Sequence, residues 1–256
     1  MLPATKRNPV VVCAIQYEPK LHAVFENIAV AQQLCYEAAA KGAKVVVLPE
    51  LALSGYHLQS PAEAAKVSQT KNGYQTEAFV PITKKFGCTI VFGYVELLEG
   101  KFYNSAAVVG PNGLAGNAQK HNLYASDNLW SQPSEQQPIS VLTPAGRLGV
   151  LICRDAMNKY RESYVHYKQG QKFYNPGDVD TIALLTNWGT SVFSYPDSTW
   201  VELVESTRAN VIVSNRVGKE KDVTFKGGCA VIDRDRKIYT YGSNFTHEAI
   251  VGGLVY

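Results

Sequence analysis

A chain of 256 residues, 46% of them hydrophobic, is long enough for one large domain or two small ones and can bury a full core. A net charge of +3 on a balanced background does not provide the broad basic surface typical of nucleic-acid binding. No apolar stretch reaches the roughly 18 residues that cross a membrane. The first ten residues also lack the apolar segment of a signal peptide.

The cysteines favour a reduced, cytoplasmic protein. Five are scattered along the chain, and no two form a Cys-x-x-Cys pair. Their odd number and wide spacing argue against a disulfide framework and a zinc site, and the five histidines do not cluster either. We therefore expect a cytoplasmic protein without a metal site.

Apolar strands alternate with helices along the chain. In the first half, strands are predicted at 10–18, 43–50, 88–96 and 103–113, and helices at 24–39 and 77–87. In the second half, strands are predicted at 146–153, 180–189, 211–218, 228–235 and 248–256, and a helix at 198–210. The apolar run within 43–50 predicts a strand buried on both faces. This alternation is typical of an α/β protein with helix-covered sheets, and we expect one domain over residues 1–256.

Three predicted strands finish on polar or aromatic side chains. Glu50 follows one apolar run, Cys153 follows a second, and Asn187 and Trp188 follow a third. In open α/β sheets, ligands bind at the carboxyl ends of the strands, so these side chains can converge on one site.

Cys153 has two interpretations. Most free cysteines are small buried hydrophobic residues. The adjacent Arg154 and Asp155 set Cys153 apart from the other cysteines and favour a nucleophile. A nucleophilic thiol needs a base or a positive neighbour, and a Cys–His pair would require His57 or His121 to approach through the fold.

Glu50 and Lys120 also have an ordinary and a chemical interpretation. Glu50 is either a cap or salt bridge at a strand end, or a half-buried general base with a raised pKa. Lys120 taken alone is most simply interpreted as a surface lysine, and only the residues around it can indicate a catalytic role. The sequence lacks the motifs of serine hydrolases, nucleotide-binding loops and zinc proteases.

Taken together, these segments resemble those of the carbon–nitrogen hydrolase, or nitrilase, superfamily over nearly the whole chain. VVVLPELALSGY resembles the family's glutamate motif, AQKHNLY its lysine motif and GRLGVLICRD its cysteine motif. FYNSAAVVGPNG, TNWG, RANVIVSNRVG and GGCAVIDRD match flanking segments. The resemblance implies a four-layer α-β-β-α sandwich and a catalytic triad of Glu50, Lys120 and Cys153 that needs no cofactor.

The resemblance also implies a mechanism. Glu50 takes the proton of Cys153, and the thiolate attacks an amide or nitrile carbon. Lys120 and the backbone N–H of Arg154 hold the developing oxyanion. Glu50 then protonates the leaving amine and activates the water that hydrolyses the thioester.

The chain departs from the family pattern at the second acid. Many members carry a second glutamate shortly after the lysine, and no glutamate stands at that spacing here. Asp127 is favoured for this catalytic position over the more distant Glu135. A shorter carboxylate would alter the reach of the acid into the substrate pocket.

A second departure follows the cysteine. The family's Phe-Pro-Glu is replaced by a tyrosine- and lysine-rich stretch at 159–174, which is interpreted as a lid, a subunit interface or both. Asp155 is expected to be a structural anchor that pairs with Arg208. Arg154 either enters the pocket and favours an acidic substrate or forms a surface salt bridge.

We therefore predict a homo-oligomeric amidohydrolase that cleaves a small linear amide or carbamoyl group, with no nucleic-acid or membrane partner. PELALSGY is similar to carbamoyl-amine hydrolases and to the glutaminase domains of NAD synthetases. Tyr56, Arg154, Asn187 and Trp188 are expected to bind the substrate. The alternatives are a nitrilase that acts on a small nitrile, and a catalytically inactive, binding-only member of the family.

Overall fold

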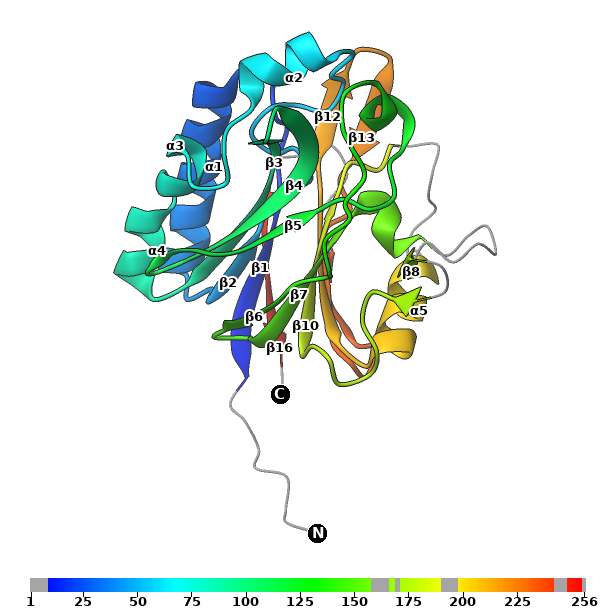
Figure 1. Ribbon diagram of the computed structural model, residues 1–256. Helices are drawn as coiled ribbons and strands as arrows, with labels where there is room; N and C mark the ends of the chain where they lie inside the picture. The colour runs from blue at the N-terminus through cyan, green and yellow to red at the C-terminus, as the bar shows by residue number, and fades with distance from the viewer. Residues whose placement is uncertain (1–8, 158–165, 169–170, 190–197, 242–247, 255–256) are drawn as a thin grey trace.

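The computed structural model describes residues 9–157, 166–168, 171–189, 198–241 and 248–254. Two six-stranded sheets pack face to face at its centre, and helices cover both outer faces (Figure 1). This arrangement confirms the predicted four-layer α-β-β-α sandwich.

The first sheet has the strand order β16-β1-β2-β3-β4-β5. Its strands are β1 (Val10–Gln16), β2 (Val45–Val47), β3 (Thr89–Leu98), β4 (Lys101–Gly110), β5 (Gly113–Gln119) and β16 (Glu248–Leu254). Strands β1, β2 and β3 run parallel, and each remaining strand pairs antiparallel with its neighbour. The helices on its outer side are α1 (Val24–Ala40), α2 (Pro61–Val67), α3 (Tyr74–Glu77) and α4 (Val80–Phe86).

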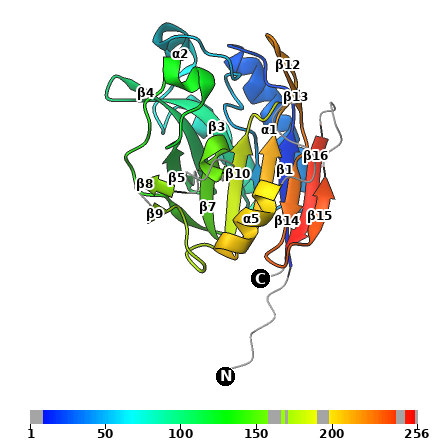
Figure 2. The same cartoon turned by 90° about the vertical axis from the view of Figure 1, so that its right-hand side faces the viewer.

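The second sheet has the strand order β15-β14-β11-β10-β7-β6. Its strands are β6 (Ser140–Thr143), β7 (Gly146–Ile152), β10 (Thr181–Thr186), β11 (Asn210–Asn215), β14 (Ala230–Ile232) and β15 (Ile238–Tyr241). Helix α5 (Ser198–Thr207) lies on its outer face (Figure 2). Two small antiparallel pairs are formed by β8 (His166–Lys168) with β9 (Gln171–Lys172), and by β12 (Val217–Glu220) with β13 (Val223–Lys226).

The alternation of side chains along a strand explains why the central strands are apolar throughout. In β1, Val12 and Ala14 join the core between the two sheets, whereas Cys13 and Ile15 pack in the core beneath α1. The residues of β2 divide between the same two cores, which confirms the strand predicted to be buried on both faces.

Several element boundaries differ from the prediction. The helix predicted at 198–210 ends at Thr207, because Arg208 has a left-handed φ of 57° and Asn210 already begins β11. Strands β5 and β6 were not predicted. Both lie at the edges of their sheets and carry few apolar residues, so the alternation typical of a strand is weak.

Helix α2 was also missed, although its start carries a recognisable signal. Ser60 precedes the helix, Pro61 is its first residue, and the Ser60 hydroxyl accepts a hydrogen bond from the Glu63 N–H at 3.2 Å. Serine at the cap, proline in the first turn and glutamate three residues on are typical of a helix N-terminus.

Most of the tyrosine- and lysine-rich stretch at 159–174 lies outside the described residues. Its last residue, Tyr174, is only 3% exposed. The Tyr174 hydroxyl donates to the carbonyl of Ile139 at 2.8 Å and accepts from the N–H of Val150 at 2.9 Å. Tyr174, at the end of this stretch, is therefore a core residue and not part of a lid or an interface.

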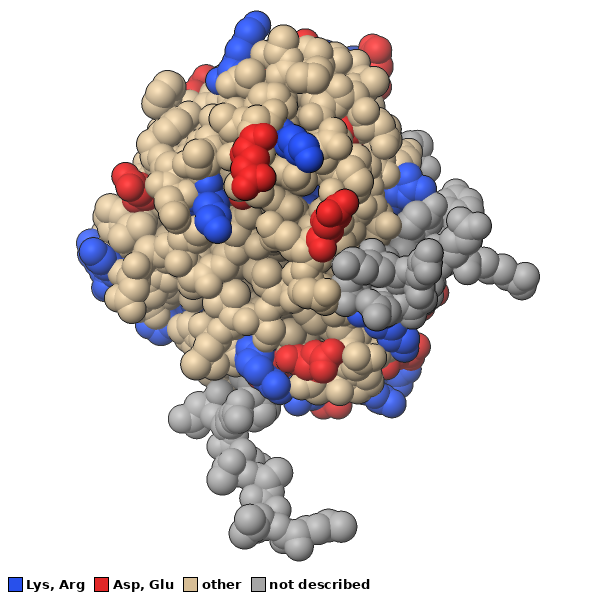
Figure 3. All heavy atoms as spheres, in the orientation of Figure 1, with Lys and Arg blue, Asp and Glu red and all other residues tan. Residues whose placement is uncertain are grey.

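On the face seen in Figure 3, basic and acidic side chains are interspersed rather than gathered by sign. No helix among the described residues is long and apolar enough to span a membrane.

Candidate active site

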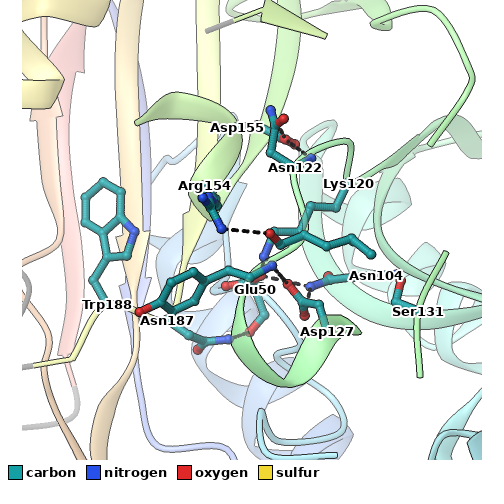
Figure 4. A network of polar contacts seen from close by, with 12 residues as sticks. Glu50, Asn104, Lys120, Asn122, Asp127, Ser131, Arg154, Asp155, Asn187 and Trp188 are labelled. Atoms are coloured by element: carbon teal, nitrogen blue, oxygen red, sulfur yellow. Dashed lines mark hydrogen bonds and ion pairs between the residues drawn. The ribbon is translucent and has the colours of Figure 1, made fainter. Parts of the chain in front are cut away.

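Four of the residues predicted from the sequence converge between the two sheets. Glu50 lies just beyond β2, Lys120 directly follows β5, and Cys153 directly follows β7. Asp127 belongs to a short 3₁₀ helix over Ala125–Leu129. Figure 4 shows Glu50, Lys120 and Asp127 pointing toward one another, and the charges of all three act on the thiol of Cys153.

Lys120 bridges two buried carboxylates. Its Nζ lies 2.7 Å from Glu50 Oε1 and 2.6 Å from Asp127 Oδ2, and all three side chains are fully buried. Burial alone would lower the pKa of Lys120, but Asp127 and Glu50 outweigh it and hold this pKa well above its ordinary value. These two carboxyl groups therefore favour the charged form of Lys120.

Glu50 has the properties of a general base. Burial raises the pKa of its carboxyl, the charge of Lys120 opposes this shift, and the charge of Asp127 adds to it. Oε1 is occupied by Lys120 and by the side-chain amide of Asn104, at 2.7 and 2.8 Å. Oε2 is buried and has no hydrogen-bond partner within the described part of the chain. One carboxylate oxygen is thus available for a proton.

Cys153 is a neutral thiol at rest. Burial and the charge of Glu50 raise its pKa, against the lowering effects of Lys120 and of a hydrogen bond from the backbone N–H of Asn187. A thiol in this environment becomes a nucleophile only when a neighbouring base takes its proton. Among the neighbouring charges, that of Glu50 acts most strongly on this thiol.

The backbone at the site is held in left-handed conformations. Leu51, Ala125 and Cys153 have φ values of 48°, 44° and 49°, each costing about 1–3 kcal/mol for a residue with a side chain. Gly93 lets β3 approach Glu50: a Cβ there would lie 2.7 Å from the Glu50 Cα. Strain and close packing of this kind concentrate where the surrounding structure fixes a functional geometry.

The alternative acid and the two histidines lie elsewhere. Glu135 is exposed, whereas Asp127 contacts Lys120. His57 Nδ1 lies 3.1 Å from Glu220 Oε1. His121 Nε2 lies 2.9 Å from the carbonyl oxygen of Gln136. Of the two candidate acids, it is therefore Asp127 that supplies the second carboxylate at Lys120. Both histidines contact other groups.

Tyr56 and Asn187, two of the residues expected to bind substrate, lie close to Glu50, whereas Trp188 packs against helix α5. Tyr56 is 6% exposed, and burial together with the charge of Glu50 raises the pKa of its phenol. Asn187 donates from its side chain to the carbonyl of Glu50 at 2.8 Å. The ring of Trp188 stacks on Trp200 of α5, with centroids 6.2 Å apart.

Arg154 lies against the segment that leads into Asp127. Its Nη1 donates to the carbonyl of Leu123 at 3.1 Å, and its guanidinium lies 5.4 Å from the centre of the Tyr124 ring. The half-buried side chain thus supports the loop that carries the second acid (Figure 4).

The prediction that Asp155 pairs with Arg208 was wrong. Asp155 is 2% exposed and accepts hydrogen bonds from the N–H and the side-chain amide of Asn122, at 2.8 and 3.0 Å. Burial raises its pKa to about 7, although these bonds lower it. Arg208 is exposed and lines a surface cleft with Glu205 and Arg236. Asp155 is an anchor as predicted, but it ties the Cys153 turn to the segment after Lys120.

Sequence reasoning missed two further groups at the site. Asn104 lies within the segment FYNSAAVVGPNG, and its side-chain amide contacts both Glu50 and Asp127. Glu220, at the end of β12, accepts hydrogen bonds from the N–H groups of Tyr56 and His57 at 2.9 and 2.6 Å. Both residues lie outside the three motifs in sequence, so the motifs did not predict that they reach the site.

Glu220 and Arg216 form a buried ion pair that supports the loop of Tyr56. Arg216 Nη1 lies 2.9 Å from Glu220 Oε2, and the two side chains are 1% and 6% exposed. Burial would raise the pKa of Glu220, but the hydrogen bond from His57 and the charge of Arg216 lower it to about 2. Its stabilising effect is therefore present above the ordinary pKa of a glutamate and is lost as the pH falls toward about 2.

We expect Glu220→Gln to destabilise the protein by about 3–5 kcal/mol at neutral pH, because Arg216 is left as a buried charge without its counterion. The difference from wild type should shrink in acid, where wild-type Glu220 is itself protonated. Urea denaturation at neutral and acid pH measures both. Glu205→Gln, which removes a largely exposed ion pair with Arg236, is the matched control and should change stability little. An equal loss of stability in Glu220→Gln and Glu205→Gln would contradict a stabilising role of the buried Glu220–Arg216 ion pair.

The chain is similar to known proteins both in sequence and in fold. A model of the carbon-nitrogen hydrolase family matches residues 11–254. The chain therefore belongs to the carbon–nitrogen hydrolase family. It is 25% identical to a nitrilase of Pyrococcus abyssi over 252 residues, which cover 95% of this chain and 88% of that protein. It is 36% identical to the omega-amidase NIT2 of Danio rerio over 175 residues, which cover 64% of this chain and 61% of that protein.

The matches also include larger proteins and solved structures. The chain is 26% identical to a glutamine-dependent NAD(+) synthetase of Acinetobacter baylyi over 240 residues, covering 91% of this chain but 42% of that protein. An amidase from Nesterenkonia sp. has the same fold, with a TM-score of 0.79, 17% identity and coverage of 96% of this chain and 90% of that one. Family membership and these relatives support a carbon–nitrogen hydrolase activity.

Proposed function

We propose that the protein is an amidohydrolase that cleaves a small linear amide or carbamoyl C–N bond through a thioester on Cys153, with Glu50, Lys120, Asp127 and Cys153 as its catalytic residues. The observation that carries this proposal is a buried Glu50 with one carboxylate oxygen bound by Lys120 and the other without a hydrogen-bond partner among the described residues. One carbon–nitrogen hydrolase domain accounts for the family match over 11–254.

Glu50 is the general base of the first step. Its free Oε2 takes the thiol proton of Cys153, and the thiolate sulfur forms a bond to the amide carbon. The raised pKa of Glu50 brings it closer to that of the thiol, so the transfer is less uphill than to an ordinary carboxylate. The same proton is then passed to the leaving amine as the C–N bond breaks.

Lys120 stabilises the negative charge that develops on the substrate oxygen. A buried ammonium between two carboxylates is fixed in place and needs no rearrangement during the reaction. Asp127 orients Lys120 from the side opposite Glu50. Water activated by Glu50 then hydrolyses the thioester and regenerates the thiol.

The amidases among the relatives favour an amide substrate. An omega-amidase, an (R)-stereoselective amidase and a protein N-terminal amidase all match the chain. Tyr56, Arg154, Asn187 and Trp188 are proposed to contact the substrate around the reacting carbon. The guanidinium of Arg154 beside the site favours a substrate that carries a carboxylate.

Ammonia release from a matched set of substrates tests this function. Butyramide, propylurea and butyronitrile share a propyl group and present an amide, a carbamoyl amine and a nitrile. Succinamate adds a carboxylate to an amide. We expect turnover of the amides or propylurea, fastest with succinamate. Release from butyronitrile alone would identify a nitrilase, and no release with any member of the set would favour a binding-only protein.

A further inference from the structure

Asn104 contacts both acids of the site. It lies within β4, is fully buried, and donates from one side-chain nitrogen to Glu50 Oε1 at 2.8 Å and to Asp127 Oδ1 at 3.2 Å. An amide NH₂ has two hydrogens, one for each carboxylate. Figure 4 shows Asn104 between the two acids.

These bonds close a ring of four side chains. Lys120 joins Glu50 Oε1 to Asp127 Oδ2, and Asn104 joins Glu50 Oε1 to Asp127 Oδ1. The backbone of Asn104 belongs to the same assembly, since its carbonyl accepts from the Lys120 N–H at 2.8 Å and its N–H donates to Ser131 Oγ at 3.0 Å. Asn104 therefore places both acids relative to the lysine.

The orientation of the amide is set by charge. Oδ1 of Asn104 is buried and has no hydrogen-bond partner in the described part of the chain. A flip would satisfy neither acid and would place this oxygen against two carboxylates. A buried amide oxygen without a partner costs free energy that the two charge-assisted bonds offset.

We propose that Asn104 is a positioning residue, which directs Glu50 Oε1 and Asp127 toward Lys120 and so leaves Glu50 Oε2 as the acceptor for the thiol proton. The inference rests on the proposed function of Glu50. A neutral donor is suited to this place, because a second cation would lower the pKa of Glu50 further and a third acid would repel the two carboxyl groups. Asn104 also lowers the pKa of Glu50 through its hydrogen bond.

Two measurements on the full chain test this role. The first is kcat/KM for the best amide. The second is the pH dependence of iodoacetamide alkylation at Cys153, followed by peptide mass spectrometry, which does not require turnover. Asn104→Ala should lower kcat/KM by about 10- to 100-fold, mainly through kcat. It should also move the acid limb of the alkylation profile to higher pH, because Glu50 holds its proton more tightly.

The chain supplies a matched control. Asn117 also donates to a buried carboxylate, that of Glu96, at 2.9 Å, but outside the candidate site. Asn117→Ala should leave the alkylation profile unchanged. Asn104→Asp keeps the size of the side chain and adds an acid, so its acid limb should move further than that of Asn104→Ala. It also tests the role if the alanine variant does not fold.

The outcomes separate this inference from the proposed function. Folded Asn104 variants with the wild-type alkylation profile would overturn the positioning role, whether or not an amide is hydrolysed. A shifted profile in a protein that hydrolyses no amide would support the role of Asn104 and remove the proposed function. A similar shift in Asn117→Ala would overturn the role, because the effect would not be specific to the site.

Discussion

Replacing Cys153 with alanine is expected to abolish amide hydrolysis, with a fall in kcat of about a million-fold, as when other enzymes lose their nucleophile. The reason is covalent: without the sulfur no thioester forms, and Lys120 and Glu50 alone can only polarise the substrate and a water molecule. Ammonia release measures the loss. The fold should persist, because the substitution removes one buried atom and keeps the backbone.

Cys88→Ala is the matched control for this experiment. Cys88 is also fully buried but lies in the core beneath the helices, away from the cluster. The Cys88→Ala variant should keep its activity while losing about as little stability as Cys153→Ala. Ammonia release that persists in Cys153→Ala, or that disappears equally in Cys88→Ala, would remove Cys153 from the nucleophile position.

Lys120→Met is expected to damage both catalysis and stability. Loss of an oxyanion donor typically lowers kcat by about 100- to 1000-fold. The substitution also leaves the Glu50 and Asp127 carboxylates buried without their cation, a change that costs about 3–5 kcal/mol when a buried pair is broken. The pKa of Glu50 should rise further, because the lowering effect of Lys120 is lost. Urea denaturation and ammonia release measure the two effects.

A second substitution separates these effects. Adding Asp127→Asn to Lys120→Met removes one of the two unbalanced charges, so part of the stability should return while activity stays low. Lys44→Met, at an exposed lysine that donates to the carbonyl of Phe86, is the control for the loss of a lysine and should change little. A Lys120→Met protein with wild-type stability would contradict a cation held between two buried acids.

The local chemistry of the chain was largely readable in its sequence. Apolar runs and helical periodicity located the main strands and helices, because burial on one or both faces imposes a pattern on residues that are close in sequence. Glu50 and Cys153 were found because each follows such a run, whereas Lys120 was found only because AQKHNLY resembles the family's lysine motif. The edge strands β5 and β6 were missed, because weakly buried strands leave only a weak apolar pattern. The amphipathic helix α5 was predicted to begin at Ser198, where it does begin.

Contacts between distant segments were decided only by the tertiary structure. Nothing local distinguishes Asn104 from other asparagines, and its proposed role arises because the fold brings its side chain against both Glu50 and Asp127. The same holds for Asp155, whose partner is Asn122 rather than Arg208. A hydrogen bond depends on distance and direction in space, which the pattern of one segment does not contain. The sequence determined which groups can react, and the packing of the two sheets determined which of them touch.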